Sequence, residues 1–139
     1  MEHMLARVFA VLLFLSNSAQ LKAADPPGGA VALTTGEIRQ VFANVKDEAE
    51  VQDAAGTHAV NYWYSDGTFT NTWRNANASG EVAGRWWARD GKRCVMITAG
   101  LPAREGVAQC SPVYRRGDHY LSIEPDGRIH GIHRLSTID

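Results

Sequence analysis

From Gly56 onward, apolar and polar residues alternate in short runs that are separated by glycine-containing turns. Alternation with a period of two is typical of strands that bury one face. We expect strands near residues 57–64, 68–74, 81–89, 92–98, 107–115, 119–124 and 128–134. About seven short strands in succession favour an antiparallel meander, either a curled sheet or a small barrel. The predicted fold class is therefore mainly β.

The turns between these strands carry recognisable hairpin signals. Asp66-Gly67, Asp90-Gly91 and Asp126-Gly127 are Asp-Gly pairs, and Arg116-Gly117-Asp118 adds a fourth turn. Asp-Gly favours two-residue hairpin loops because both central residues must adopt a positive φ. The same reading explains the integrin-type tripeptide at 116–118 as a hairpin tip.

Two-residue loops also predict which side chains share a face. At Asp66-Gly67, Tyr64 would lie opposite Phe69, which places Val60, Tyr62, Tyr64, Phe69 and Trp73 in the core and Asn61, Trp63, Thr70 and Thr72 outside. At Asp90-Gly91, Trp86 would lie opposite Val95 in the core, and Trp87 opposite Cys94 on the other face. Arg93 interrupts this second core face.

One short helix is predicted before the strands. Thr34-Thr35-Gly36-Glu37 fits a capping box, and an apolar stripe follows at helical spacing. We expect a helix from about residue 35 to 44 that packs over one face of the sheet or plugs one end. The acidic stretch 46–53 shows no period and is predicted to be a solvated loop.

The only two cysteines, Cys94 and Cys110, lie symmetrically about Pro102 on adjacent predicted strands. This position favours a disulfide across a hairpin, which is common in small exported domains. Two free thiols remain the alternative.

The N-terminus has the three-part layout of a signal peptide. A charged start precedes the apolar run 8–15, and small and polar residues follow it. We expect a signal peptide at 1–23, a flexible lead-in at 24–32 and a single β-rich domain at 33–139. Cleavage after Ser18 is a rival site, and a buried N-terminal helix of a cytosolic protein is the alternative interpretation. The predicted location is the bacterial periplasm or the outside of the cell.

The charge balance excludes some partners. With 14 basic and 15 acidic residues, the net charge is −1, which gives no electrostatic case for nucleic acid. No later apolar run approaches the about 20 residues of a membrane span. The oligomeric state is not predicted by the sequence.

Several motifs occur together in a recognisable order. They are Leu33-Thr34-x-x-Glu37-Ile38, Asp66-Gly67-Thr68, Gly84-x-Trp86, Asp90-Gly91-Lys92-x-Cys94, Cys110-x-x-Val113-Tyr114-Arg115 with Gly117-Asp118, and Asp126-Gly127. This order resembles a group of small exported alphaproteobacterial proteins that carry a domain of unknown function. The resemblance covers about residues 33 to 131, with Arg93 at a place that is more often apolar in the group. It implies an all-β fold with a bridge between the two cysteines and no particular activity.

No cofactor, metal site or catalytic residue is predicted. His130 and His133 lie three apart, so they point to opposite faces of a strand and do not chelate without a bulge; we expect these histidines, with His119 nearby, to be solvated. The carboxylates Asp53, Glu81 and Glu124 are scattered along the chain. No serine lies in a nucleophile elbow, and no phosphate-binding loop is present.

What remains is surface chemistry. Outward-facing tryptophan and arginine side chains are compatible with an interaction surface, because these residues dominate binding hot spots. The favoured alternative is that the barrel or the helix covers this face, or that the register differs by one residue. The candidate residues are Arg85, Trp87, Arg89 and Met96 on the strands and Leu101 and Arg104 in the loop 99–106. The predicted function is a non-catalytic exported binding domain for a periplasmic protein or a small ligand. An inhibitor of an exported enzyme that acts through the loop, and an uncharacterised enzyme, are the alternatives.

Overall fold

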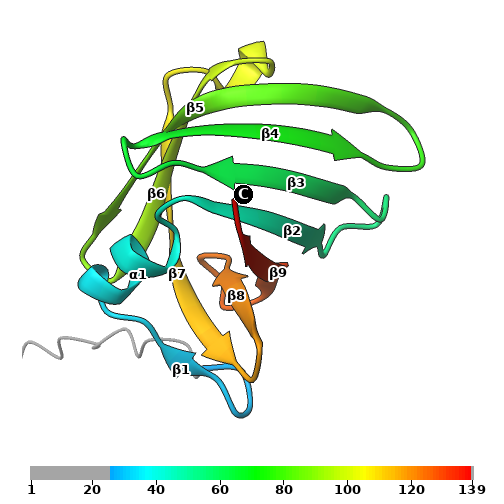
Figure 1. The fold of residues 1–139 in the computed structure, drawn as a ribbon. Coiled ribbons are helices and arrows are strands. Elements are labelled where there is room, and N and C mark those ends of the chain that lie inside the picture. The colour runs from blue at the N-terminus through cyan, green and yellow to red at the C-terminus, as the bar shows by residue number, and fades with distance from the viewer. Residues whose placement is uncertain (1–25, 139) are drawn as a thin grey trace, which may run out of the picture.

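The computed structural model describes residues 26–138, in which all the strands belong to one antiparallel sheet (Figure 1). The elements are β1 (Val31–Ala32), α1 (Thr35–Val41), β2 (Val45–Val51), β3 (His58–Trp63), β4 (Thr68–Arg74), β5 (Ser79–Arg89), β6 (Lys92–Ala99), the 3-10 helix η1 (Pro102–Arg104), β7 (Ala108–Arg116), β8 (His119–Ile123) and β9 (Ile129–Thr137). The predicted signal peptide lies outside the described residues.

Strands β2 to β9 form a closed eight-stranded barrel. Each strand pairs with the next one along the chain, and β9 pairs with β2 to close the cylinder. This is an up-and-down meander, so the predicted mainly β class is confirmed in its barrel form. The short strand β1 pairs with β7 outside this cycle, which extends strand pairing into the predicted lead-in.

The turn at Asp90-Gly91 sets the register that the sequence predicts. Asp90 and Gly91 have φ angles of 50° and 71°, as a two-residue hairpin turn requires. Trp86 therefore faces Val95 inside the barrel, and Trp87 faces Cys94 on the outside.

The turn at Asp66-Gly67 differs from the prediction by one residue. Tyr64 donates its backbone N–H to Thr68, so the loop has three residues and Gly67, at φ 86°, forms its left-handed end. Trp63 consequently lies opposite Phe69. The predicted placement of Trp63 outside and Tyr64 inside is wrong, because one extra loop residue exchanges the two faces of β3.

The exchange of faces puts a different set of side chains in the core. On β3 the inward residues are Ala59, Asn61 and Trp63, all buried, whereas Val60, Tyr62 and Tyr64 alternate with them. On β4, Phe69 is buried and Trp73 packs half-buried against the core, as predicted, and Thr70 and Thr72 face outward.

The segment predicted to be a solvated loop contains strand β2. It pairs with β3 on one side and β9 on the other, so it is needed to close the barrel. Its burial alternates: Asp47 and Ala49 are buried, and Glu48 and Glu50 are exposed. The prediction failed because the inward position 47 is a carboxylate, which hides the apolar period that identifies strands.

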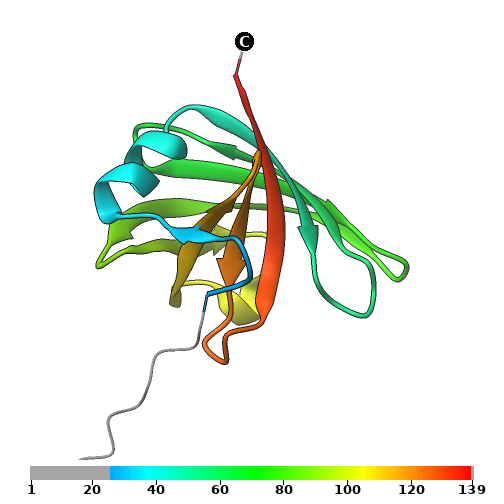
Figure 2. The same cartoon turned by 90° about the horizontal axis from the view of Figure 1, so that it is seen from below.

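Helix α1 covers one end of the barrel (Figure 2). Thr34 and Glu37 form the predicted capping box. The helix ends at Val41, three residues before the predicted end, and Asn44 then adopts a φ of 57°. Ile38 and Phe42 are fully buried, and the Phe42 ring packs edge-on against Trp63 and Trp86. The apolar stripe of the helix therefore plugs this end, hereafter the α1 end.

A disulfide joins Cys94 to Cys110, as predicted. The two residues lie directly opposite each other on β6 and β7, on the outer face of the barrel. Among residues 26–138, none of the helices is long and apolar enough to cross a membrane.

We predict that replacing both cysteines by serine lowers the free energy of unfolding by about 3 kcal/mol, since the bond closes a loop with a sequence separation of 16 residues. Urea unfolding of the oxidised protein and of the double variant measures this difference. Under reducing conditions the two proteins should unfold at the same urea concentration. A double variant as stable as the oxidised wild type would show that the barrel does not depend on the bond.

Candidate functional site

A cluster of polar side chains lies inside the barrel. Its buried members come from five different strands: Asp47 on β2, Asn61 on β3, Arg93 on β6, Ser122 on β8 and His133 on β9. Polar groups at this depth are costly unless they are hydrogen-bonded. Their partners therefore decide what the cluster does.

The carboxylate of Asp47 is the centre of the cluster. It accepts hydrogen bonds from His133 Nδ1 at 2.9 Å, Trp63 Nε1 at 2.9 Å and Asn61 Nδ2 at 3.2 Å. Asn61 in turn accepts a bond from Asn71 of β4 at 2.6 Å. One carboxylate thus links β2 to β3 and β9, and through Asn61 to β4.

His133 connects this carboxylate to Ser122. Its Nδ1 donates to Asp47, which leaves Nε2 as the acceptor, 2.9 Å from Ser122 Oγ. Ser122 is therefore the donor in the second bond. The result is a Ser122–His133–Asp47 chain in the tautomer that serine hydrolases use.

Gly131 makes room for this chain. It lies opposite Ser122 on β9, and a Cβ atom built there would be 3.0 Å from His133 Nε2 and 3.2 Å from Ser122 Oγ. Any larger residue would push the two side chains apart. The glycine is explained by this contact. The β8–β9 pairing also shifts register beside it, between Ser122 and Ile123, but no metal-binding group of three side chains forms among residues 26–138.

Arg93 lies in the same interior, beneath α1. Its guanidinium carbon is 4.6 Å from the centre of the Phe42 ring and 4.5 Å from that of the Trp63 ring. Two aromatic faces thus provide cation–π contacts. Its Nε and Nη1 atoms are buried and have no hydrogen-bond partner among residues 26–138.

The electrostatics follow from burial and contacts. Burial lowers the pKa of His133 more than the charge of Asp47 raises it, so the imidazole is neutral at neutral pH. Burial would raise the pKa of Asp47, but the interactions with His133, Arg93 and Trp63 outweigh it and lower that pKa. Burial also lowers the pKa of Arg93, although an arginine stays protonated at neutral pH. The interior therefore holds one negative and one positive charge.

The hydrogen-bonded chain alone does not make a hydrolase. Ser122 is completely buried, and acyl transfer requires a substrate carbonyl beside the nucleophile and donors for the oxyanion. In this conformation the cluster instead joins strands. The expectation that the histidines are solvated is wrong for His133, which is 4% exposed, and holds for His130, which is exposed.

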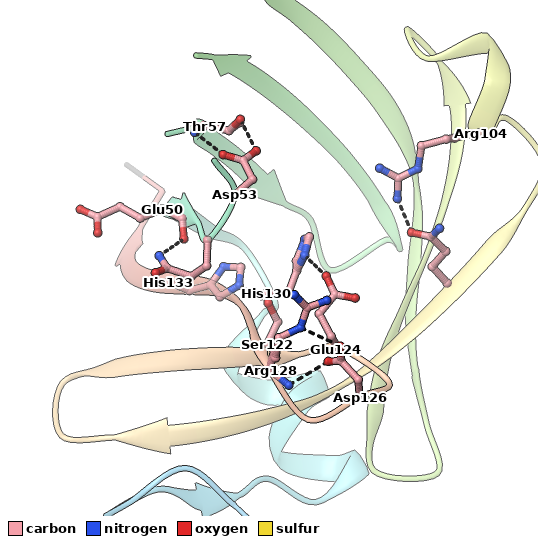
Figure 3. A network of polar contacts seen from close by, with 12 residues as sticks. Glu50, Asp53, Thr57, Arg104, Ser122, Glu124, Asp126, Arg128, His130 and His133 are labelled. Atoms are coloured by element: carbon pink, nitrogen blue, oxygen red, sulfur yellow. Dashed lines mark hydrogen bonds and ion pairs between the residues drawn. The ribbon is translucent and has the colours of Figure 1, made fainter. Parts of the chain in front are cut away.

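Figure 3 shows the contacts at the end of the barrel opposite α1. On the β8–β9 hairpin, His130 bonds Glu124 at 2.7 Å and Arg128 bonds Asp126 at 2.6 Å. On the β2–β3 loop, Asp53 accepts bonds from Thr57. Among residues 26–138, no three His, Cys, Asp or Glu side chains are placed to hold a metal ion.

The residues predicted to form an interaction surface fall into two groups. Arg85, Trp87 and Arg89 lie on the outer face of β5, and Met96 lies opposite Arg85 on β6. Leu101 and Arg104 lie in the β6–β7 loop, outside the two strands that carry this group.

The loop residues are engaged within the protein. Leu101 is half-buried and packs against the core, and the Arg104 guanidinium bonds the Gln109 side chain. The structure thus brings four of the six candidates together, and we name Arg85, Trp87, Arg89 and Met96 the β5–β6 patch.

Sequence reasoning missed the whole interior cluster. Asp47 was assigned to a loop, and Ser122 and His133 lie 11 residues apart on different strands and showed no common pattern. The available signals were the glycine at 131 and the arginine at 93, each of which breaks the pattern of its strand.

Together, fold and interior define an eight-stranded up-and-down barrel with a polar centre, a helical plug and one disulfide. No protein-family model, no curated protein and no solved structure matches the chain.

We predict that the stability of the barrel decreases as the pH falls from about 7.5 to about 5.5. Below the ordinary histidine pKa of about 6.5, the unfolded chain binds a proton that buried His133 does not bind, because its folded-state pKa is lowered. The free energy of unfolding is therefore lost as the pH falls through this range. Urea unfolding at several pH values measures the slope.

His133→Gln should flatten this slope. Arg134→Gln, an exposed change at the next residue of β9 that removes no histidine, is the matched control and should leave the slope unchanged. A His133→Gln variant with the wild-type slope would mean that another group takes up the proton.

Proposed function

We propose that this protein is a non-catalytic binding domain of the bacterial periplasm or extracellular space, and that it binds an acidic protein partner through the β5–β6 patch. The observation that carries this proposal is the composition of the patch. Half-buried Trp87 lies on β5 between two exposed arginines, Arg85 and Arg89. Tryptophan and arginine are the residues most enriched at interface hot spots.

The charge of the patch favours an acidic partner. Arg85, Arg89 and Lys92 surround Trp87. Against these three basic groups, Asp90 pairs with Arg89 at 3.3 Å, and Asp66 bonds Thr68, which lies opposite Arg85. None of the ion pairs within residues 26–138 involves Arg85 or Lys92. The chain as a whole has a net charge of −1, so this local excess of positive charge is a directional feature that steers an acidic surface.

The patch is also held rigid. Trp87 lies opposite Cys94, which is bonded to Cys110 on the next strand. The backbone of such a covalently tied sheet has little conformational entropy to lose on binding. The disulfide therefore supports a function in which the β5–β6 patch binds a partner directly.

A photo-cross-linker at position 87, in the protein produced by its native cell, tests this proposal. We expect a discrete cross-linked product with one acidic protein. The same cross-linker at position 134 is the control, because exposed Arg134 lies on β9, four strands around the barrel from β5 in either direction. Position 134 should give no such product.

The charge requirement is tested with purified partner. Arg85→Glu should weaken binding by about 2 kcal/mol or more, as expected for a hot-spot residue, and Arg134→Glu should leave it unchanged. Equal cross-linking from positions 87 and 134, or binding that Arg85→Glu does not weaken, would contradict the proposal.

The hydrogen-bonded chain of Ser122, His133 and Asp47 favours a second candidate, acyl transfer. The zero exposure of Ser122 opposes it. A fluorophosphonate probe decides between the two: labelling of the native protein that is lost in Ser122→Ala would favour the enzyme.

A further inference from the structure

Arg93 is a buried charged residue with two guanidinium nitrogens, Nε and Nη1, that have no hydrogen-bond partner among residues 26–138. We propose that its guanidinium anchors a ligand site at the α1 end of the barrel, and that the site takes a small amphipathic carboxylic acid. This site is separate from the β5–β6 patch and does not depend on it.

The first argument is the state of the guanidinium. Arg93 is 8% exposed, and its Nε and Nη1 atoms have no hydrogen-bond partner among residues 26–138. Buried polar groups are nearly always paired, and an orphaned donor on a charged group needs a specific explanation. A carboxylate explains it, because planar guanidinium and carboxylate groups form short, charge-assisted hydrogen bonds.

The second argument is that Asp47 does not fill this role. Its oxygens already accept hydrogen bonds from His133, Trp63 and Asn61. Within residues 26–138, the Asp47 carboxylate and the Arg93 guanidinium do not form an ion pair, because their charged atoms are not within 4.0 Å of each other. Asp47 compensates the charge of Arg93 at longer range but leaves its Nε and Nη1 atoms unpaired. Three donors spread the negative charge of Asp47, which limits its repulsion of a second carboxylate.

The third argument is the apolar surrounding, which defines the other half of the ligand. Phe42 and Trp63 lie against the guanidinium, and Ile38, Trp86 and Val113 belong to the same core cluster. An inorganic anion would gain nothing from these side chains, whereas an acid with a hydrocarbon chain buries it among them. The interior of an eight-stranded barrel is either filled by side chains or holds one small ligand, so the acid must replace a side chain here.

The fully buried Phe42 ring occupies the place proposed for the hydrocarbon chain. This residue directly follows α1, whose main contacts are with β5 and β6. In the ligand-free barrel, its ring covers Arg93 at the plugged end. Ligand entry displaces this ring, and the hydrocarbon chain of the acid takes its place against Trp63 and Trp86.

Intrinsic fluorescence tests the site, because Trp63 and Trp86 lie within it. Decanoate, below its micelle-forming concentration, should change the emission saturably and raise the midpoint of thermal unfolding. Decanol, with the same chain and no charge, and inorganic phosphate, with a charge and no chain, should each bind about tenfold or more weakly.

Arg93→Gln should weaken decanoate binding about tenfold or more, in line with the loss of hydrogen bonds to a charged group. Arg134→Gln, at an exposed position of β9, is the matched control and should bind as the wild type does. If Arg93→Gln does not fold, the comparison of decanoate, decanol and phosphate with the wild-type protein decides alone. Equal binding of decanoate and decanol, phosphate binding as tight as that of decanoate, no saturable response to decanoate, or unchanged affinity in folded Arg93→Gln would each overturn the proposal.

Discussion

The buried carboxylate of Asp47 constrains the rest of the barrel. An ionised group without water must receive hydrogen bonds from the protein, and here the donors come from β3 and β9, the two neighbours of β2. These bonds hold only in one register, with Asn61, Trp63 and His133 all pointing inward. Because β2 and β9 form the pair that closes the cylinder, the carboxylate lies at the closure itself. The hydrogen bond from His133 to Asp47 also constrains β8. The other ring nitrogen of His133 bonds Ser122, and Gly131 must be small enough to allow that contact.

The sequence predicts the local parts of this fold well. The seven predicted strands, the capping box at Thr34 and the Asp90-Gly91 register follow from turn chemistry and from residues close together in the chain. Cys94 and Cys110 are predictable for the same reason, since a single hairpin relates them. The predictions fail where residues that are distant in the sequence determine the local structure. A carboxylate at position 47 is typical of a loop, and only its partners on β3 and β9, up to 86 residues away, make it compatible with a strand. The inward face of β3 is predicted wrongly because the loop before Thr68 has one more residue than expected. An Asp-Gly pair alone does not distinguish a two-residue loop from a three-residue loop.

The candidate site also has a part that the sequence predicts and a part that it does not. The β5–β6 patch could be predicted because it depends on alternation along two adjacent strands. The interior cluster could not, because Asp47, Arg93, Ser122 and His133 converge only when the barrel closes. These two regions have different properties. The outer patch combines the exposed Arg85 and Arg89 with half-buried Trp87 and Met96 beside the disulfide. The interior holds one negative and one positive charge and is covered at one end by α1. The proposed partner protein and the proposed amphipathic acid therefore bind different parts of the same barrel.

The stability of the Asp47→Ala variant tests most directly whether this carboxylate holds the barrel together. Removal of the carboxylate leaves the side chains of His133, Trp63 and Asn61 without their acceptor and Arg93 without its compensating charge. We predict a loss of about 3–5 kcal/mol in the free energy of unfolding, the range found when one partner of a buried charge pair is removed. Glu48→Ala, at the adjacent exposed position of β2, should change the stability by about 0.5 kcal/mol or less. A loss of less than about 1 kcal/mol for Asp47→Ala, within the range of an ordinary substitution, would contradict the account.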